Sequence, residues 1–177
     1  MKRDWLITLR KNKNLTQADV ADSIFIDRAY YSQIESGTRN PSVDISRNLA
    51  KVLDINPSLL LSDLAAFQEV FTRTKCMLAH SDLDLRYTWI FDSANQEEVN
   101  QFIGARDDEL SFCIDSQKLI SLKQRVLDTK ETSGTFAEYE YNNEVHTHYI
   151  VGYPLLGEEG ELIGIGTFGI KINALGL

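Results

Sequence analysis

The N-terminal part of the chain repeats apolar residues at helical spacing, in short runs that polar turns separate. Residues 3–11 predict a first helix whose apolar side chains share one face. Thr16 and Asp19 have the spacing of a capping box, so a second helix is expected to begin at Gln17. One face of this second helix carries the apolar residues Val20, Ala21 and Ile24.

A third helix is predicted over residues 28–36, with Asp27 as its cap, Gly37 as its stop, and Tyr31 and Ile34 facing inward. Its outward positions are Arg28, Ala29, Tyr30, Ser32 and Gln33. A polar helical face rich in Arg and Gln, held by a helix packed across it, can meet base edges in a major groove. From this pattern alone, an ordinary helical hairpin with a solvated outer face remains the alternative.

Two more helices are predicted after this hairpin. Ser42 is placed to cap one of them, and Asn56 with Pro57 begins the other. From Leu60 onwards, apolar residues recur at spacings of three and four with one polar interruption, the pattern of a heptad seam. The seam positions are Leu60, Leu64, Phe67, Phe71, Thr74 and Leu78. We therefore predict a connecting helix over residues 65–81, whose seam packs either on its own domain or on a second copy of the chain.

The second half of the chain changes to strand and mixed patterns. Residues 85–91 are aromatic and β-branched and predict a strand, and a polar helical stretch follows over residues 94–102. Residues 116–129 predict a helix with a clear apolar face. Three strands close the chain, over residues 135–141, 145–155 and 162–172. These elements predict an α+β domain with an antiparallel sheet that is covered on one face.

The formal charge also differs between the N-terminal part and the rest of the chain. Residues 1–56 hold 9 Lys and Arg against 7 Asp and Glu, a net charge of +2, whereas the remainder is net −10 within a total of −8. An acidic bulk argues against non-specific adhesion to nucleic acid or to an anionic membrane. Any affinity for DNA must therefore come from a small local surface, which favours two copies of that surface and hence a dimer.

Other sequence features exclude several classes of protein. Cys76 and Cys113 are too few for a disulfide framework, and the chain has neither a signal-peptide core nor an apolar run of membrane length, so we expect a cytoplasmic protein. No nucleophile elbow, phosphate-binding glycine loop or zinc-protease helix is present, which argues against an enzyme. The acidic pairs Asp107-Asp108 and Glu158-Glu159 are interpreted as solvated turns.

Ordered positions through the N-terminal part carry a family resemblance. They are Trp5, Leu6, Leu9 and Arg10, then Leu15-Thr16-Gln17, Val20-Ala21, residues 34–42 and residues 50–53. Together they resemble the Cro/repressor-type, or XRE, helix-turn-helix family over roughly residues 3–64. The resemblance implies a DNA-binding domain of about five helices, an internal ion pair between Arg10 and Glu35, and a recognition helix that begins at Arg28. The predicted DNA-contacting residues are Gln17, Arg28, Ala29, Tyr30, Ser32, Gln33, Arg39 and Asn40.

The C-terminal part carries a second resemblance. Residues 84–90, Ile103-Gly104 with residues 107–110, Pro154-Leu155 and residues 160–164 resemble a PAS sensor domain. That family implies a curved antiparallel sheet around a small-molecule pocket, and a domain that also dimerises. The aromatic candidates for lining the pocket are Tyr87, Trp89, Phe112, Tyr139, Tyr149, Tyr153 and Phe168. Each of them also fits an ordinary core position.

The cofactor is left unknown. The Asn-Cys-Arg-Phe-Leu motif of flavin-binding light sensors is missing, and no histidine lies between His80 and His146, so the sequence argues against flavin and against haem. His146 and His148 share one face of a strand, where they can bind a metal or form an internally hydrogen-bonded pair. No metal site is assigned to them.

The combined prediction has three parts: an all-α helix-turn-helix domain (1–64), the connecting helix (65–81) and an α+β PAS-like domain (82–177). The expected function is a sequence-specific transcriptional regulator that binds an inverted-repeat operator in double-stranded DNA as a homodimer. Its PAS-like domain would sense a small molecule or another cue, without a membrane partner. The alternative is a constitutive repressor or protein-interaction regulator in which that domain only dimerises.

Overall fold

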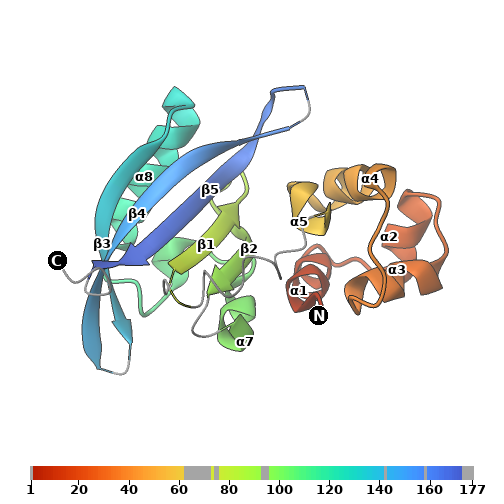
Figure 1. The fold of residues 1–177 in the computed structure, drawn as a ribbon, viewed down its shortest axis with the longest axis horizontal. Helices are drawn as coiled ribbons and strands as arrows, with labels where there is room; N and C mark the ends of the chain where they lie inside the picture. Colours follow the sequence, from red (N-terminus) through yellow and green to blue (C-terminus); the bar gives the residue numbers. More distant parts are fainter. Residues whose placement is uncertain are drawn as a thin grey trace. The chain divides into compact units, whose positions relative to one another are not determined.

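The chain folds into two compact units, Met1–Asp63 and Leu64–Leu177. The structure is a computed structural model that describes residues 2–61, 73, 76–92, 96–141, 143–157 and 159–172. Figure 1 shows a helical first unit and a second unit built on a sheet.

The first unit consists of five described helices: α1 (Asp4–Asn12), α2 (Gln17–Ser23), α3 (Arg28–Glu35), α4 (Val43–Leu53) and α5 (Ser58–Leu61). Its core is formed by the apolar faces that the sequence pattern predicted. The fully buried side chains include Leu6, Val20, Tyr31, Ile34, Leu49, Leu53 and Leu60. This arrangement confirms the predicted all-α helix-turn-helix class.

Side chains fix the ends of α2 and α3 as predicted. The Thr16 hydroxyl accepts a hydrogen bond from the Asp19 backbone N–H at 3.1 Å, and the Asp19 carboxylate accepts one from the Thr16 N–H at 2.7 Å, which completes the capping box. The Asp27 carboxylate accepts a 2.6 Å bond from the N–H of Ala29. After α3 the chain turns through Gly37, which has φ +72°, a conformation that glycine adopts readily.

The second unit is a five-stranded antiparallel sheet with the strand order β2-β1-β5-β4-β3. Its strands are β1 (Cys76–Ser81), β2 (Tyr87–Asp92), β3 (Ser133–Tyr141), β4 (Glu144–Leu156) and β5 (Leu162–Lys171). Between β2 and β3 the chain forms α7 (Gln96–Val99), η1 (Asn100–Phe102), η2 (Asp107–Glu109) and α8 (Ser116–Thr129). This arrangement confirms the predicted α+β class with an antiparallel sheet.

Helix α8 covers one face of the sheet and lies behind it in the view of Figure 1. Val126 of α8 packs with Leu85 and Ile165 in a buried apolar cluster. Gly152 of β4 lies so close to α8 that a Cβ atom there would stand 3.2 Å from Val126. Glycine at this position therefore lets the helix approach the sheet closely.

The predicted connecting helix over residues 65–81 is wrong at its C-terminal end, because residues 76–81 form strand β1. This strand lies between β2 and β5, so the sheet has one more strand than predicted. The sequence of β1 was mistaken for a helix because it has apolar side chains on both faces and therefore lacks the apolar–polar alternation of a half-buried strand. Over only six residues, such a run also fits helical spacing. The seam positions Leu64, Phe67, Phe71 and Thr74 lie outside the described residues.

Candidate functional sites

A buried ion pair joins the first and third helices. The Nε atom of Arg10 lies 2.6 Å from Oε1 of Glu35, and its Nη2 lies 3.3 Å from Oε2. The third nitrogen, Nη1, donates to the carbonyl of Leu15 at 2.7 Å. The hydrogen bond with Glu35 raises the pKa of Arg10 above its ordinary value. The predicted ion pair is therefore present, and its charges compensate one another.

Gln17, which was predicted to contact phosphate, belongs to the same network. Its Nε2 donates to Oε2 of Glu35 at 2.8 Å, and its side chain is half-buried. The first residue of α2 is thus attached to the end of α3. The side chain of Gln17 has an internal structural partner, which sequence reasoning did not assign to it.

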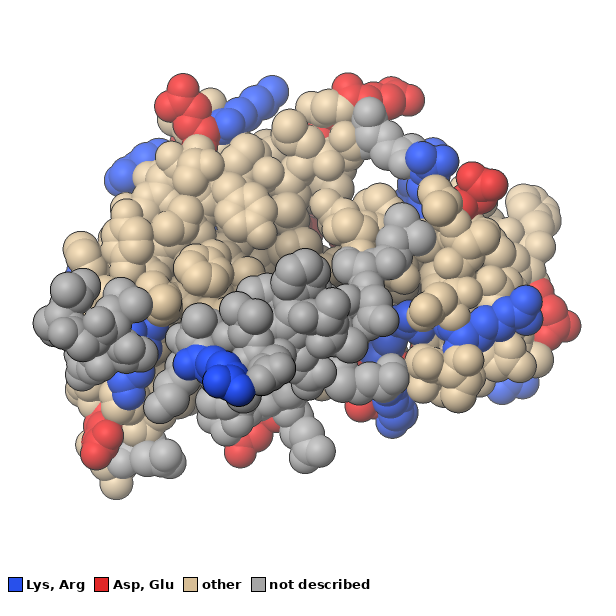
Figure 2. Space-filling view, in the orientation of Figure 1, with Lys and Arg blue, Asp and Glu red and all other residues tan. Residues whose placement is uncertain are grey.

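The outward face of α3 places the predicted base-reading residues together. Arg28, Ala29 and Gln33 are exposed, whereas Tyr30 and Ser32 are half-buried. The guanidinium of Arg39, in the loop after α3, lies 4.3 Å from the centre of the Tyr30 ring. This cation–π contact makes the α3 face and the following loop one continuous surface. The visible face of the helical unit in Figure 2 carries more Lys and Arg than Asp and Glu.

Arg3 is a residue that sequence reasoning missed. Its Nη1 donates to the carbonyl of Ile34 at 2.6 Å, and its Nη2 donates to Oδ1 of Asn40 at 2.6 Å. A longer bond of 3.3 Å reaches the carbonyl of Arg39. Arg3 therefore holds the loop that carries Arg39 and Asn40 against the end of α3. No local pattern around Arg3 signals these contacts, because their partners lie more than thirty residues away.

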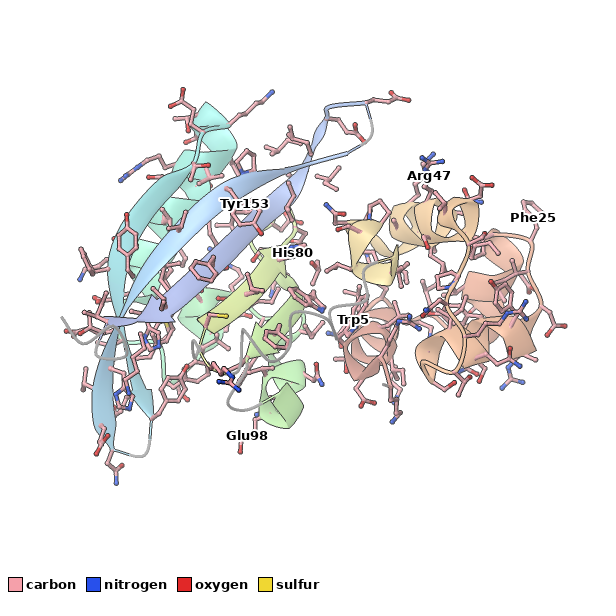
Figure 3. All side chains as sticks on the ribbon, viewed as in Figure 1. Trp5, Phe25, Arg47, His80, Glu98 and Tyr153 are labelled. Atoms are coloured by element: carbon pink, nitrogen blue, oxygen red, sulfur yellow. The ribbon has the colours of Figure 1, made fainter. Side chains whose placement is uncertain are left out.

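The turn between α2 and α3 contains an unusual aromatic residue. Phe25 has φ +56°, in the left-handed region, and its side chain is 96% exposed. Figure 3 shows it at the outer edge of the helical unit. A left-handed backbone is strained for a residue with a Cβ atom, and the exposed ring has little packing to offset that strain.

The second unit contains a cavity of about 130 Å³ between the sheet and the segment that runs from α7 to Phe112. Twelve described residues line it: Met77, Ala79, Tyr87, Ile90, Asp92, Glu98, Val99, Phe102, Leu110, Phe112, Tyr139 and Tyr141. Most of them are aromatic or aliphatic. Because Glu98 is exposed, the cavity reaches the surface beside α7.

Known proteins resemble both units. The family model for helix-turn-helix proteins matches residues 6–60. The uncharacterised HTH-type transcriptional regulator YqaF of Bacillus subtilis (strain 168) is 41% identical over 64 residues, which cover 36% of this chain and 84% of YqaF. The chain belongs to the family of helix-turn-helix transcriptional regulators.

The regulator also resembles solved structures of VqmA. VqmA bound to DPO aligns with a TM-score of 0.53 and 15% identity, over 62% of this chain and 58% of that one. The VqmA–ligand–DNA complex of Vibrio cholerae aligns with a TM-score of 0.51 and 16% identity, over 61% of this chain and 51% of that one. The regulator thus matches only part of the VqmA chain, and the likeness is one of fold. A PAS domain from Colwellia psychrerythraea aligns over 63% of this chain and 98% of its own, with 12% identity and a TM-score of 0.48.

Three of the seven predicted pocket residues line the cavity of the regulator: Tyr87, Phe112 and Tyr139. Trp89, Tyr149, Tyr153 and Phe168 do not line it, because the strand register places them on the opposite face of the sheet. This opposite face is largely uncharged in Figure 2, and Tyr153 and His80 are labelled on it in Figure 3.

A register shift explains why Tyr87 and Trp89 lie on different faces although they are two residues apart. Tyr87 pairs with Ser81 and Trp89 pairs with His80, so the bulge between the two pairs inserts one extra residue into β2. The simple alternation of a regular strand would place the rings of Tyr87 and Trp89 on the same face of the sheet. No residue in the stretch predicts the bulge.

A second buried ion pair lies beside the cavity. Nζ of Lys123 stands 2.7 Å from Oδ2 of Asp107, and both side chains are only 1% exposed. The Tyr87 hydroxyl donates to Oδ1 of Asp107 at 2.5 Å, and Lys123 Nζ lies 3.9 Å from the centre of the Tyr87 ring. Burial lowers the pKa of Lys123, and burial with the nearby Asp107 charge raises the pKa of Tyr87. The predicted solvated turn at Asp107 is therefore wrong, whereas Asp108 is exposed as expected.

The two strand histidines have internal partners. Nδ1 of His148 lies 3.3 Å from the carbonyl of His146, and its ring meets Tyr139 edge-on at 5.1 Å between centres. Burial lowers the pKa of His148. His146 stacks near Tyr141, with 6.1 Å between ring centres. The described ranges hold no group of three or more His, Cys, Asp or Glu side chains placed to bind a metal ion. Within the same ranges, no helix has both the length and the apolar character of a membrane span.

Proposed function

We propose that this regulator binds an inverted-repeat operator as a homodimer and that a small molecule in the PAS-like unit changes this binding. One observation carries the proposal. The chain combines two features: the first unit exposes the polar face of α3, and the second unit contains a cavity of about 130 Å³. The PAS-like domain would then act as the sensor and the helix-turn-helix domain as the output, in the cytoplasm and without a membrane partner.

The recognition helix supports the DNA-binding half of the proposal. Arg28 stands exposed in the first turn of α3, where a guanidinium can donate two hydrogen bonds to a guanine edge. Arg39 and Asn40 occupy the next loop, where they can contact the phosphate backbone. The net charge of −8 means that one copy of this surface gives little non-specific attraction, which favours two copies acting together.

The cavity supports the sensing half. A PAS-like unit that served only for dimerisation would need no hollow interior, whereas a partly buried apolar cavity with a few polar groups is typical of ligand sites. VqmA itself has been solved as a complex with a ligand and DNA, and as a dimer without its target DNA. A ligand can regulate the operator affinity of this chain only if it binds two arrangements of the dimer with different affinities.

Selection from random duplexes with the full chain, followed by titration of the selected duplex, tests the DNA-binding half. We expect an enriched inverted repeat with half-site centres about 10 bp apart or a multiple of that spacing. Binding that shows no preference between selected and scrambled duplexes would overturn it.

Mass spectrometry under native and denaturing conditions tests the sensing half. We expect an extra mass that denaturation releases from the wild-type protein and that is absent from Ala79→Phe, because Ala79 is buried in the cavity wall. Equal masses and equal operator affinities for the two proteins would instead favour the dimerisation-only alternative.

A further inference from the structure

We infer that the cavity binds a small organic amine: one aromatic ring, or an apolar group of similar size, that carries a protonated nitrogen. This inference rests on the proposed sensor function and names the chemical class of its ligand. Three features of the cavity lead to it, namely its size, its aromatic wall and the sign of the charges that line it.

The size of the cavity suits a single ring. Its volume of about 130 Å³ is similar to that of a dry apolar cavity of ~150 Å³ that is known to accept benzene. Met77, Ala79, Ile90 and Val99 supply aliphatic walls. A ring placed among them would lose most of its contact with water, which is the main source of affinity for an apolar group.

The wall on the β3 side is aromatic. Phe112 lies 4.9 Å from Phe102, 5.4 Å from Tyr141 and 6.3 Å from Tyr139, measured between ring centres. Burial raises the pKa of Tyr139 and of Tyr141, so both phenols stay neutral near pH 7. The faces of such rings attract a cation, and they do so more strongly when the cation is partly removed from water.

Among the described residues that line the cavity, both charged ones are acidic. Asp92 ends β2, and Glu98 lies on α7, the helix that carries its label in Figure 3. None of the twelve described lining residues carries a positive charge. The nearby buried cation, Lys123, is not in the lining, and its charge is balanced by Asp107 at 2.7 Å. Asp92 has a partner of its own within the protein, so the exposed Glu98 is the carboxylate that a ligand would meet at the mouth of the cavity. A carboxylate or phosphate ligand would meet like charge there, whereas an ammonium would meet opposite charge.

A ligand that combines these features would place its ring among the aliphatic walls and its nitrogen toward Glu98. The exposed position of Glu98 leaves the charged end in contact with solvent, so the amine need not lose all of its hydration. The faces of the aromatic wall then favour a cation between the buried ring and the Glu98 carboxylate.

Three ligands of nearly equal size but different charge test the inference on the full chain. The probes are phenethylamine, 2-phenylethanol and 3-phenylpropanoate, with binding measured by calorimetry and by the shift in thermal midpoint at pH 7. We expect phenethylamine to bind about tenfold more tightly than the alcohol, which corresponds to about 1.4 kcal/mol, and the acid to bind more weakly than either. High salt should narrow the difference between the amine and the alcohol.

Two variants show which carboxylate causes the preference. Glu98→Gln should reduce the preference for amine over alcohol, whereas Glu140→Gln should leave it unchanged. Glu140 is a matched control because it is an exposed acid on β3, between two lining tyrosines, that does not line the cavity.

Two results would overturn the inference: acid binding as tight as amine binding, or an amine preference that survives unchanged in the Glu98→Gln protein. Failure of all three probes to bind would also overturn it. None of these results touches the proposed function, which is judged separately by operator selection and by the bound mass that Ala79→Phe removes.

Discussion

The side-chain amide of Gln17 donates a hydrogen bond of 2.8 Å to the buried carboxylate of Glu35. Glu35 already pairs with Arg10, so a single carboxylate connects α1, the start of α2 and the end of α3. The two helices of the helix-turn-helix are therefore fixed to one another by a partly buried hydrogen bond in addition to their apolar faces. A rigid connection of this kind keeps the exposed side chains of α3 in a constant arrangement.

Removing one member of the Arg10–Glu35 pair should strongly destabilise the helical unit. We expect Glu35→Leu to lower the free energy of unfolding by roughly 3–5 kcal/mol, because the buried guanidinium of Arg10 loses its partner. The double variant Arg10→Met, Glu35→Leu should recover much of that loss, since it leaves no uncompensated charge. Urea unfolding of the three proteins measures both effects. A double variant that is less stable than Glu35→Leu would contradict this account.

Arg28 and Arg39 should affect DNA binding in different ways. Arg28→Ala is expected to weaken binding to the selected operator by about 1–3 kcal/mol while leaving a scrambled duplex almost unchanged, because a base contact carries sequence information. Arg39→Ala should weaken both duplexes and reduce the salt slope by about one. Fluorescence anisotropy at several salt concentrations separates the two patterns. An equal loss on both duplexes for Arg28→Ala would remove it from base recognition.

The strained turn at Phe25 should respond to glycine. Phe25→Gly is expected to raise the free energy of unfolding by about 1 kcal/mol, because glycine adopts φ +56° without steric cost and the exposed ring loses little packing. Phe25→Ala is the control, since it removes the same ring but keeps the Cβ atom. An equal gain for both variants in urea unfolding would show that the ring, and not the backbone, causes the effect.

His80 should make the second unit sensitive to acid. Burial lowers its pKa from 6.5 to about 4, so the unfolded chain binds a proton more readily than the folded chain between these values. The neutral, buried imidazole of His80 therefore contributes its full share of stability above pH 6.5. This share of the free energy of unfolding is lost progressively as the pH falls toward 4, by up to about 3 kcal/mol. His80→Leu should remove that part of the pH dependence in urea unfolding from pH 7 to pH 4. A variant with an unchanged pH profile would exclude His80 as its source.

Local signals in the sequence predicted the helical unit well. Thr16, Asp19 and Asp27 lie at helix starts, and their hydrogen bonds involve residues two or three positions away, so the sequence itself contains both partners. The Arg10–Glu35 pair came from a family resemblance, because its two members are 25 residues apart. The contacts of Arg3 follow no local pattern and required the structure.

In the second unit, one local signal was overlooked and two features left no local signal. Lys123 lies four residues after Leu119 and three before Val126, so helical spacing placed it on the buried face of α8. That position was a signal for a buried cation, and a buried cation requires an acid such as Asp107. Strand β1 and the bulge beside Tyr87 left no comparable signal, since both depend on how β1 pairs with its neighbouring strands in the sheet.

Strand β1 has a further consequence because of its place in the chain. Met77 and Ala79 of β1 line the cavity, and β1 is hydrogen-bonded along both of its edges, to β2 and to β5. It is also the first described strand after the helical unit in the sequence. A ligand in the proposed site that displaced Met77 or Ala79 would therefore act on the described strand that lies nearest in sequence to the helical unit. In this chain, the wall of the proposed ligand site and the covalent connection to the helical unit are therefore neighbours in the sequence.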